Sequence, residues 1–385
     1  MDTKVLIIGG GLSGLHCAYR LSKLKVDFLL MEGRGRLGGR ILSYDHEGNP
    51  AGRHSGGYDM GPTWFWPGQT RMENLVRELD LVDKVFLQFG AGDSLYEDGN
   101  SIQRGIPGFS MAGSYRVSGG LQQIVLALQD NLPAETVYRD AQATRLNLES
   151  GSVVAECRRN GELMEIRSEL TVLALPPRLA MQSIEFAPAL AADRVAEFRA
   201  IPTCMAGHAK LLAIYDQPFW RERGFSGDVI SQTGPLREIH DASPEVGGPY
   251  ALFGFFGVSA KQRQQRGSEM IPAAIDQLTR LFGNEAQSPA SVFIKDWAED
   301  RHTATDGDRE MLNFHPAPAL RRSAEPEWDR RVLWAGSEAS NSAERVNGFL
   351  EGAIESSERV IAAIESHLMP ETTGYAGVNN QGIAE

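Results

Sequence analysis

Cysteine is scarce in this chain of 385 residues, where Cys17, Cys157 and Cys204 lie far apart. Without a C-x-x-C pair the sequence indicates neither a disulfide framework nor a zinc site, and we expect no bound metal. Long apolar runs are also absent, since no stretch approaches the roughly eighteen residues that span a bilayer. We therefore do not expect a disulfide-built or membrane-spanning protein.

Positive charge is in short supply as well, with 38 Lys and Arg against 50 Asp and Glu and a net charge of −12 at pH 7. No Lys/Arg cluster interrupts this balance, which argues against nucleic acid or an anionic membrane as a partner. Residues 1–4 lead directly into an apolar strand pattern and leave no room for a secretory signal, so we expect a cytoplasmic protein. Residues 369–385 are polar and predict a flexible tail.

The first forty residues carry the most specific pattern in the chain. An apolar run at 4–8 predicts a strand, and glycines spaced G-x-G-x-x-G follow it before a helical pattern. The free N–H groups of such a helix favour an anion, which we predict to be a pyrophosphate held by Gly9, Gly11, Leu12, Ser13 and Gly14. A second predicted strand, 26–31, ends in Glu32, which is placed to bind ribose hydroxyls. The alternative is a glycine-rich turn that binds nothing.

The next segment, residues 32–40, indicates which dinucleotide is bound. Gly38 and Gly39 allow close approach of the backbone, and Arg34 and Arg40 can neutralise phosphate. With Glu32 and Gly33, the segment resembles the E-x-R-x-R-x-G-G-R stretch of the flavin amine oxidase family, where it runs along the ribose and diphosphate of FAD. A solvated basic loop is the alternative.

A second cofactor segment stands near the C-terminal end. Residues 331–339 predict a strand ending in a turn of small residues, and a helix follows up to about residue 367. The pair resembles the family's A-G-[TSE]-E block and the helix whose N-terminus points at the flavin. The resemblance implies cofactor contacts for Gly336, Ser337, Glu338, Gly348, Phe349 and Leu350. A surface amphipathic helix is the alternative.

Aromatic residues gather at 59–67, which resembles the family's turn beside the isoalloxazine ring. That resemblance implies cofactor contacts for Gly61, Pro62, Thr63 and Trp64, although such aromatics also pack protein cores. Trp64, Trp66 and Phe349 are the predicted substrate-binding residues.

Trp297 matches a conserved cofactor-site tryptophan of the family. Aligning from it places Asp306 where the mammalian enzymes carry a covalent cysteine, which implies non-covalent FAD.

The most specific match on the substrate side is residues 207–221, which contain Lys210 and the sequence Pro-Phe-Trp-Arg. They resemble the monoamine oxidase segment in which a lysine holds a water at flavin N5. Lys210 is therefore the predicted catalytic residue. A lysine among apolar strand residues can alternatively protect a sheet edge.

The predicted fold is α/β, with a Rossmann-type FAD-binding domain interwoven with an α+β substrate domain that contains a mixed sheet. We assign residues 1–70, 115–187 and 306–368 to the first domain, and 71–114 and 188–305 to the second. Helices are predicted at 72–81, 118–132 and 268–282. Strands are predicted at 144–156, 163–175, 208–215 and 249–257, with a hairpin turn at Asn160-Gly161. By resemblance, the chain crosses between domains at Pro176-Pro177.

The resemblance implies an amine oxidase: hydride passes from the α-carbon of a neutral amine to flavin N5, the imine hydrolyses, and O2 is reduced to H2O2. The partners are then a small amine and O2, with a homodimer as one assembly. Alternatives are a C–C desaturase or protoporphyrinogen-type oxidase, and a catalytically silent flavin-bound accessory protein. An L-amino-acid oxidase needs an arginine for the carboxylate, and none stands out beside the 59–66 loop.

Overall fold

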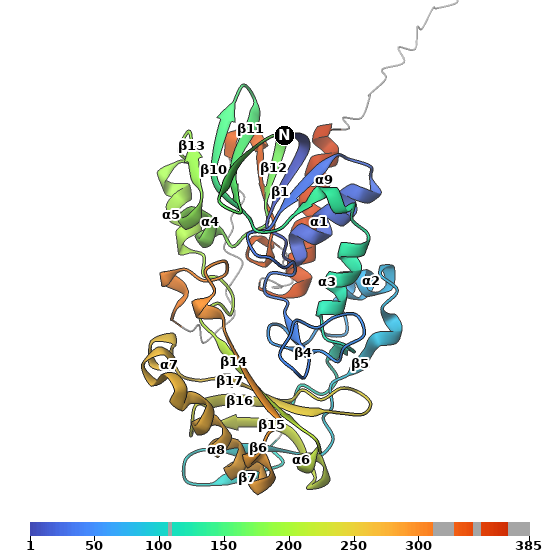
Figure 1. Ribbon diagram of the computed structural model, residues 1–385, viewed down its shortest axis with the longest axis vertical. Coiled ribbons are helices and arrows are strands. Elements are labelled where there is room, and N and C mark those ends of the chain that lie inside the picture. Colours follow the sequence, from blue (N-terminus) through green and yellow to red (C-terminus); the bar gives the residue numbers. More distant parts are fainter. Residues whose placement is uncertain (107–109, 311–326, 342–347, 369–385) are drawn as a thin grey trace, which may run out of the picture.

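The computed structural model describes residues 1–106, 110–310, 327–341 and 348–368. Two β-sheets lie at opposite ends of the molecule, each with helices on it (Figure 1). The sheet at the N-terminal end contains β1 (Asp2–Ile8), β2 (Phe28–Met31), β9 (Val137–Tyr138), β10 (Ala141–Glu149), β11 (Ser152–Arg159), β12 (Glu162–Leu173), β13 (Glu185–Ala187) and β19 (Val332–Trp334).

Strand β12 joins two kinds of pairing within this first sheet. Its first half pairs antiparallel with β11, and its second half pairs parallel with β1 and β19. Because β1, β2 and β19 run parallel to β12, their carboxyl ends lie along one edge of the sheet, where ligands of open α/β sheets bind. Gly9, Glu32 and Gly336 therefore lie at or near the same edge.

The second sheet is mixed, as predicted, because β15 pairs parallel with β6 while the other pairs are antiparallel. It consists of β6 (Asp93–Glu97), β7 (Ile102–Arg104), β14 (Ala209–Tyr215), β15 (Phe225–Ser231), β16 (Leu236–Asp241), β17 (Tyr250–Phe256) and β18 (Ser291–Asp296). Two short pairs, β3 (Ser43–Tyr44) with β4 (Tyr58–Asp59) and β5 (Val85–Leu87) with β8 (Tyr115–Val117), complete the strands that the structure describes.

The helices are distributed over both sheets. They are α1 (Leu12–Lys23), α2 (Thr70–Glu78), α3 (Gln122–Asp130), α4 (Pro177–Ser183), α5 (Ala192–Ala200), α6 (Phe219–Glu222), α7 (Ala260–Arg266), α8 (Met270–Phe282) and α9 (Leu350–Leu368). Helix α8 packs on the outer face of the second sheet through Met270, Leu278 and Phe282, so the opposite face of that sheet is turned toward the first (Figure 1). Over the described ranges, no helix has both the length and the apolar composition to cross a membrane.

Helices α1 and α9 lie side by side in the core of the first sheet, although more than 300 residues separate them. Small polar residues fit between them: the Ser13 and Ser356 hydroxyls are 3.2 Å apart, and His16 Nδ1 lies 2.5 Å from the Ser357 hydroxyl. Burial lowers the pKa of His16 to about 4, so this imidazole is neutral in the helix contact. The packing brings the N-termini of both helices to one end of the core.

Several expectations from the sequence are confirmed and others are wrong. The hairpin turn forms at Asn160-Gly161, where both residues have positive φ. The β-structure predicted at 144–156 forms, but it is divided between β10 and β11, because Ser150 and Gly151 form a second such turn between them.

The chain also does not leave the first sheet at the two prolines. Pro177 starts α4, β13 then pairs with β10, and α5 packs Phe198 into the core of the first sheet.

The contacts of α2 and α5 therefore differ from the domain division drawn from the sequence. Both helices fall in segments assigned to the substrate domain, yet both pack on the core of the first sheet. Glu351 of α9 accepts hydrogen bonds from the Arg71 and Met72 N–H groups and so caps the start of α2. Such tertiary contacts leave no local signal in the sequence. The predicted tail at 369–385 lies outside the described residues.

Candidate active site

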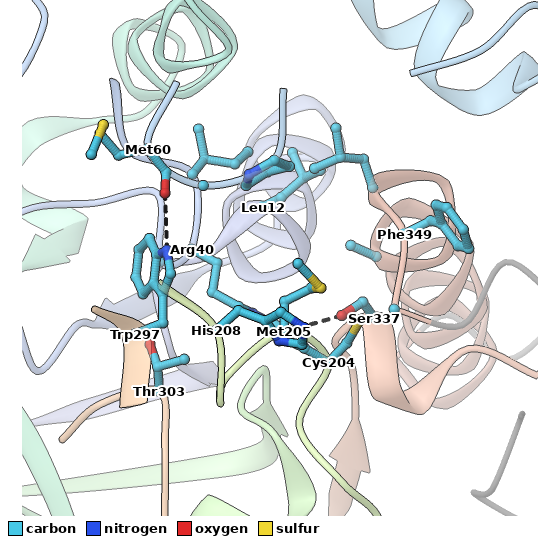
Figure 2. A pocket seen from close by; sticks show the side chains of 18 of the residues that line it. Leu12, Arg40, Met60, Cys204, Met205, His208, Trp297, Thr303, Ser337 and Phe349 are labelled. Carbon is cyan, nitrogen blue, oxygen red and sulfur yellow. Dashed lines mark hydrogen bonds between the residues drawn. The ribbon is translucent and has the colours of Figure 1, made fainter. Parts of the chain in front are cut away.

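A cavity of about 750 Å³ lies between the carboxyl edge of the first sheet and the inner face of the second. Figure 2 shows how Leu12 from α1, Phe349 from the start of α9, and the Cys204–His208 segment converge on it. This volume is within the usual range for small-molecule and cofactor sites.

Glycines build the wall of the cavity beside α1. Gly9 has φ of 109°, and a side chain on Gly14 would place its Cβ 1.9 Å from the Gly9 carbonyl oxygen. Gly11 differs from Gly14: a Cβ added to Gly11 would meet no atom closer than the Gly39 Cα, at 4.0 Å. Helix α1 begins directly after Gly11 without a side-chain cap, so its first N–H groups are left for a ligand. The turn at Gly9–Gly11 and the start of α1, here called the glycine cradle, thus leave space and N–H donors for a bulky anion.

Glu32 holds the same turn. Its Oε2 accepts a hydrogen bond from the Gly10 N–H and its Oε1 one from the Arg34 N–H, both at 2.8 Å. A carboxylate has about four lone-pair sites, so both oxygens retain capacity for ribose hydroxyls. Glu32 lines the cavity and remains our candidate ribose ligand.

The structure brings nearly all the predicted cofactor residues to this cavity. Those that line it are Gly9, Gly11, Leu12, Ser13, Glu32, Arg34, Gly38, Gly39, Arg40, Gly61, Pro62, Thr63, Trp64, Trp297, Gly336, Ser337, Gly348, Phe349 and Leu350. Gly14, Gly33 and Glu338 are not among the lining residues. Gly14 and Gly33 instead allow close packing, since a Cβ at Gly33 would lie 2.9 Å from the His302 ring.

The two arginines expected to neutralise phosphate are already paired with carboxylates. Arg34 donates to Asp300 at 2.6 Å and to the Thr303 hydroxyl at 2.7 Å. Arg40 binds both carboxylate oxygens of Glu338, at 2.7 and 2.9 Å. Each pair ties together segments far apart in the sequence, so a phosphate contact by either arginine stays a prediction.

Glu338 is the fully enclosed member of the second pair. Although burial opposes ionisation, the Arg40 guanidinium lowers the pKa of this carboxyl. Arg40 also donates to the Cys204 carbonyl oxygen and the Ser337 hydroxyl, the latter bond being drawn in Figure 2. The pair thus fixes the loop before β14 to the turn after β19.

The aromatic residues divide over two sides of the cavity. The rings of Trp66 and Phe349 meet edge to face with centroids 5.9 Å apart, at the N-terminus of α9. Trp64 lies against the second sheet, 4.9 Å from the His240 ring and 5.5 Å from that of Phe253. Trp297 donates to the Met60 carbonyl oxygen at 3.0 Å (Figure 2). All three predicted substrate-binding aromatics line the cavity, and Trp66 with Phe349 forms the paired wall.

Lys210, the second residue of β14, is buried, with 1% of its surface exposed. Its Nζ lies 2.9 Å from the carbonyl oxygens of Asp59 and Gly61 and 2.8 Å from the Thr63 hydroxyl. It also lies 4.0 Å from the centroid of the Phe253 ring. Burial lowers the pKa of Lys210 to about 7. The alternative of an edge-strand lysine is wrong, because β14 is paired on both sides, with β17 and β18.

These contacts fix Lys210 to the loop that carries the predicted flavin contacts. The three oxygens match the three N–H bonds of an ammonium group. That Lys210 holds a water stays a prediction. The electrostatic effect of its ammonium group would be the same with or without that water.

Sequence reasoning missed a charged group on β16. Glu238 lines the cavity, accepts a hydrogen bond from His240 Nε2 at 2.7 Å, and has 33% of its side chain exposed. The other ring nitrogen of His240 lies 2.7 Å from Asp228. Burial disfavours the imidazolium, yet the hydrogen bonds to Asp228 and Glu238 raise the pKa of His240. Residues 236–241 do not alternate regularly between apolar and polar, because the register shifts between Leu236 and Glu238, so the sequence did not show which side chains face the cavity.

Arg237 and His208 also line the cavity without having been predicted. Arg237 is an exposed residue whose side chain donates to Gln232. The sequence analysis sought an arginine only near the 59–66 loop, whereas this one comes from the opposite sheet.

Cys204 is the cysteine that lines the cavity among the described residues. Burial raises the pKa of its thiol to about 12, which makes it a poor nucleophile. Asp306 is an exposed residue of a short 3-10 helix and does not line the cavity.

The fold and the glycine-rich turn define a dinucleotide-binding protein, and comparisons with known proteins identify the family. Residues 7–79 match a family described as NAD(P)-binding Rossmann-like domain, and residues 89–364 match the family described as flavin containing amine oxidoreductase. The second match covers more than half of the chain. The chain therefore belongs to the flavin-containing amine oxidoreductases and is an FAD-dependent oxidoreductase.

Individual relatives agree with this assignment. The chain is 24% identical to a probable flavin-containing monoamine oxidase A of Dictyostelium discoideum, covering 95% of this chain and 98% of that protein. It is 30% identical over 203 residues, 51% of this chain and 41% of the other, to an L-amino acid dehydrogenase of Synechocystis. The structure of a cyclohexylamine oxidase from Brevibacterium oxydans superimposes with a TM-score of 0.78 at 19% identity, covering 96% of this chain and 100% of that one. The last comparison shows a shared fold.

Proposed function

We propose that this protein oxidises a primary or secondary amine to an imine, which water then hydrolyses. FAD supplies the hydride acceptor and, after reduction, the electrons that convert O2 to H2O2. The observation that carries the proposal is the position of Lys210: a buried amine fixed by three hydrogen bonds to the 59–63 loop, in a cavity that also contains the predicted cofactor contacts.

Different residues of the cavity would bind the cofactor and orient the substrate. The uncapped start of α1 and the Gly9–Gly11 turn would hold the diphosphate, and Glu32 the ribose. The N-terminus of α9, at Leu350, lies at the cavity and would stabilise negative charge on the reduced ring. Trp66 and Phe349 would orient the substrate, while the walls formed by Trp64 and Trp297 exclude water.

Lys210 would act electrostatically. A fixed positive charge inside a water-poor site lowers the barrier to forming negative charge nearby, and this is required when electrons pass to O2. A C–C desaturase or protoporphyrinogen-type oxidase gives no reason for this buried lysine. A silent accessory protein gives no reason for a charged cavity beside the cofactor cradle.

A second candidate function is oxidation of an amino acid. It is favoured by Arg237, which lines the cavity and could bind a carboxylate. Against it stands the carboxylate of Glu238 on the adjacent residue, which would repel the same group.

We also propose that FAD is held without a covalent bond. The thiol at the cavity, Cys204, is poorly ionised, and Asp306 lies elsewhere. Acid precipitation of the purified protein should release all the yellow colour into the supernatant. Flavin that stays in the washed pellet would contradict this.

The function is tested by mixing the FAD-loaded protein anaerobically with a panel of amines and following flavin absorbance, then admitting air and measuring H2O2. Bleaching by at least one amine, with peroxide formed in equal amount, is the expected result. A flavin that no amine reduces would overturn the proposal and leave the accessory-protein alternative.

A further inference from the structure

The inner face of the second sheet carries an ordered row of side chains that the proposed chemistry does not use in full. Lys210 lies opposite Phe255 on β17, and Phe255 lies opposite Glu238 on β16. Opposite residues of neighbouring strands project from the same face, so all three point into the cavity that they line. Since strands lie about 4.8 Å apart, Glu238 is roughly 10 Å from Lys210 along the sheet.

Glu238 differs from the other carboxylates of the site, because its hydrogen-bond and ion-pair partner is a histidine and not an arginine. Glu32 is held by main-chain N–H groups and faces Arg34, and Glu338 is bound by Arg40. Glu238 has instead one strong partner, His240, which uses one carboxylate oxygen. One third of its side chain stays exposed to the cavity.

The residues behind Glu238 keep it in place. His240 lies in the next row of the same sheet face and is itself bound to Asp228, while the Trp64 ring meets the imidazole edge to face. The group of Asp228, His240 and Glu238 therefore contains two carboxylates and one imidazole. With two carboxylates against one imidazole, the group carries net negative charge whichever form the imidazole takes, and its exposed part is the Glu238 carboxylate.

Although burial opposes ionisation of Glu238, the hydrogen bond from His240 and the charges of His240 and Lys210 lower its pKa, and the nearby cations other than His240 act on it through space. Lys210 is turned toward the 59–63 loop by its three hydrogen bonds. Arg237 projects to an exposed position where it contacts Gln232, and His208 lines the cavity two residues before Lys210. A cationic group of the substrate would thus find a carboxylate with a free face.

We propose that Glu238 is a specificity-determining residue that binds a second cationic group of the substrate, so that the preferred substrates are short aliphatic diamines. This inference rests on the proposed amine oxidation and specifies its substrate class. The reacting amine would lie at the end of the row near Lys210, against the wall formed by Trp66 and Phe349, with the far ammonium on Glu238. A chain of four carbons places its two nitrogens roughly 6 Å apart, which bridges most of the spacing between the rows.

A matched series of substrates tests the proposal: 1,4-diaminobutane, butylamine and 4-aminobutanoate share one chain length and differ only at the far end. Anaerobic reduction of the FAD-loaded protein should give a kcat/KM roughly ten- to hundredfold higher for the diamine than for butylamine, the range of a charge-assisted hydrogen bond. Equal values for these two amines would overturn the inference while leaving amine oxidation intact. Preference for 4-aminobutanoate would overturn it in favour of Arg237. Failure of all amines to reduce the flavin would overturn both proposals.

Substitutions test whether Glu238 causes the preference for the diamine. Glu238→Gln should reduce the ratio of diamine to butylamine kcat/KM to near one, whereas Asp216→Asn, which removes an exposed carboxylate just after β14, should keep the wild-type ratio. His240→Asn should lower the ratio through a higher KM for the diamine, because the imidazole only positions Glu238. Binding of 1,4-diaminobutane to the oxidised protein, measured by calorimetry, should weaken by a similar factor in Glu238→Gln. An unchanged ratio and an unchanged affinity in that variant would contradict the assignment. If Glu238→Gln does not fold, the wild-type substrate series decides.

Discussion

The two walls of the cavity are built in different ways. The wall at the first sheet presents mostly main chain, from glycines and helix N-termini, and the charges of its two arginine side chains are already paired with Asp300 and Glu338. The wall at the second sheet consists of side chains on neighbouring strands, with Lys210 and Glu238 two strands apart. A main-chain wall suits a cofactor that is the same throughout a family, since shape and N–H groups are sufficient to bind it. A side-chain wall allows the reacting group and the substrate preference to change independently of the fold.

If this division is correct, the largest loss of folding and FAD binding comes from substitutions in the first wall at positions where main-chain atoms pack directly against each other. Gly14→Ala places a Cβ against the Gly9 carbonyl oxygen, and neither group can move without shifting β1 or α1. We expect no folded, yellow protein from this variant.

Gly11→Ala is the matched control, since its Cβ faces the cavity. Its apoprotein should melt at the wild-type temperature, but it should bind FAD more weakly by about 1–3 kcal/mol, the usual cost of an added methyl group in a filled space. Wild-type FAD affinity in Gly11→Ala would show that the diphosphate does not lie on this turn.

The next effect concerns the side-chain wall. Lys210→Met should slow flavin reoxidation by O2 on the order of a hundredfold, corresponding to about 2.7–4 kcal/mol for loss of a fixed electrostatic contact, and should slow reduction by amine much less. Stopped-flow mixing of the reduced variant with oxygenated buffer measures the step, with Lys261→Met on the surface of α7 as control. A rate within about threefold of wild type, roughly 0.65 kcal/mol, would leave Lys210 a structural role only.

The next prediction concerns Glu32, which belongs to the first wall, in the variant Glu32→Gln. The amide keeps one acceptor oxygen but places an NH2 group against a main-chain N–H of the turn, so FAD should bind more weakly by roughly 1–3 kcal/mol. Fluorescence titration of the apoprotein with FAD gives the dissociation constant. An unchanged constant would exclude Glu32 as the ribose ligand.

The smallest predicted effect is a pH dependence. Because the pKa of Lys210 is lowered to about 7, its ammonium form is lost as pH rises through 7, and the rate constant of reoxidation should fall by about tenfold between pH 6 and 8. The same depressed pKa means that the folded protein binds fewer protons than the unfolded chain between about pH 7 and 10.5, so this group makes folding more favourable as pH rises. Lys210→Met should lack the kinetic transition. A transition that persists in the variant would assign it to another group.

The sequence predicted the first wall better than the second, and the reason is physical. Gly9, Gly11 and Glu32 act through local backbone geometry, so their spacing along the chain carries the signal. Glu238, His240 and Arg237 act through the register of β16 against β17, which depends on the whole sheet. The packing of α5 through Phe198 and the capping of α2 by Glu351 were missed for the same reason. Lys210 was found only because the residues around it resemble a known segment.

The most direct test of the two-wall account is to measure FAD affinity and reoxidation rate per bound flavin in Glu32→Gln and Lys210→Met side by side. The account predicts that Glu32→Gln weakens FAD binding but reoxidises at the wild-type rate once saturated, and that Lys210→Met binds FAD as wild type does but reoxidises on the order of a hundredfold more slowly. If Lys210→Met instead loses FAD while its remaining holoprotein reacts at the wild-type rate, the second wall holds the cofactor rather than assisting its chemistry, and the account is wrong.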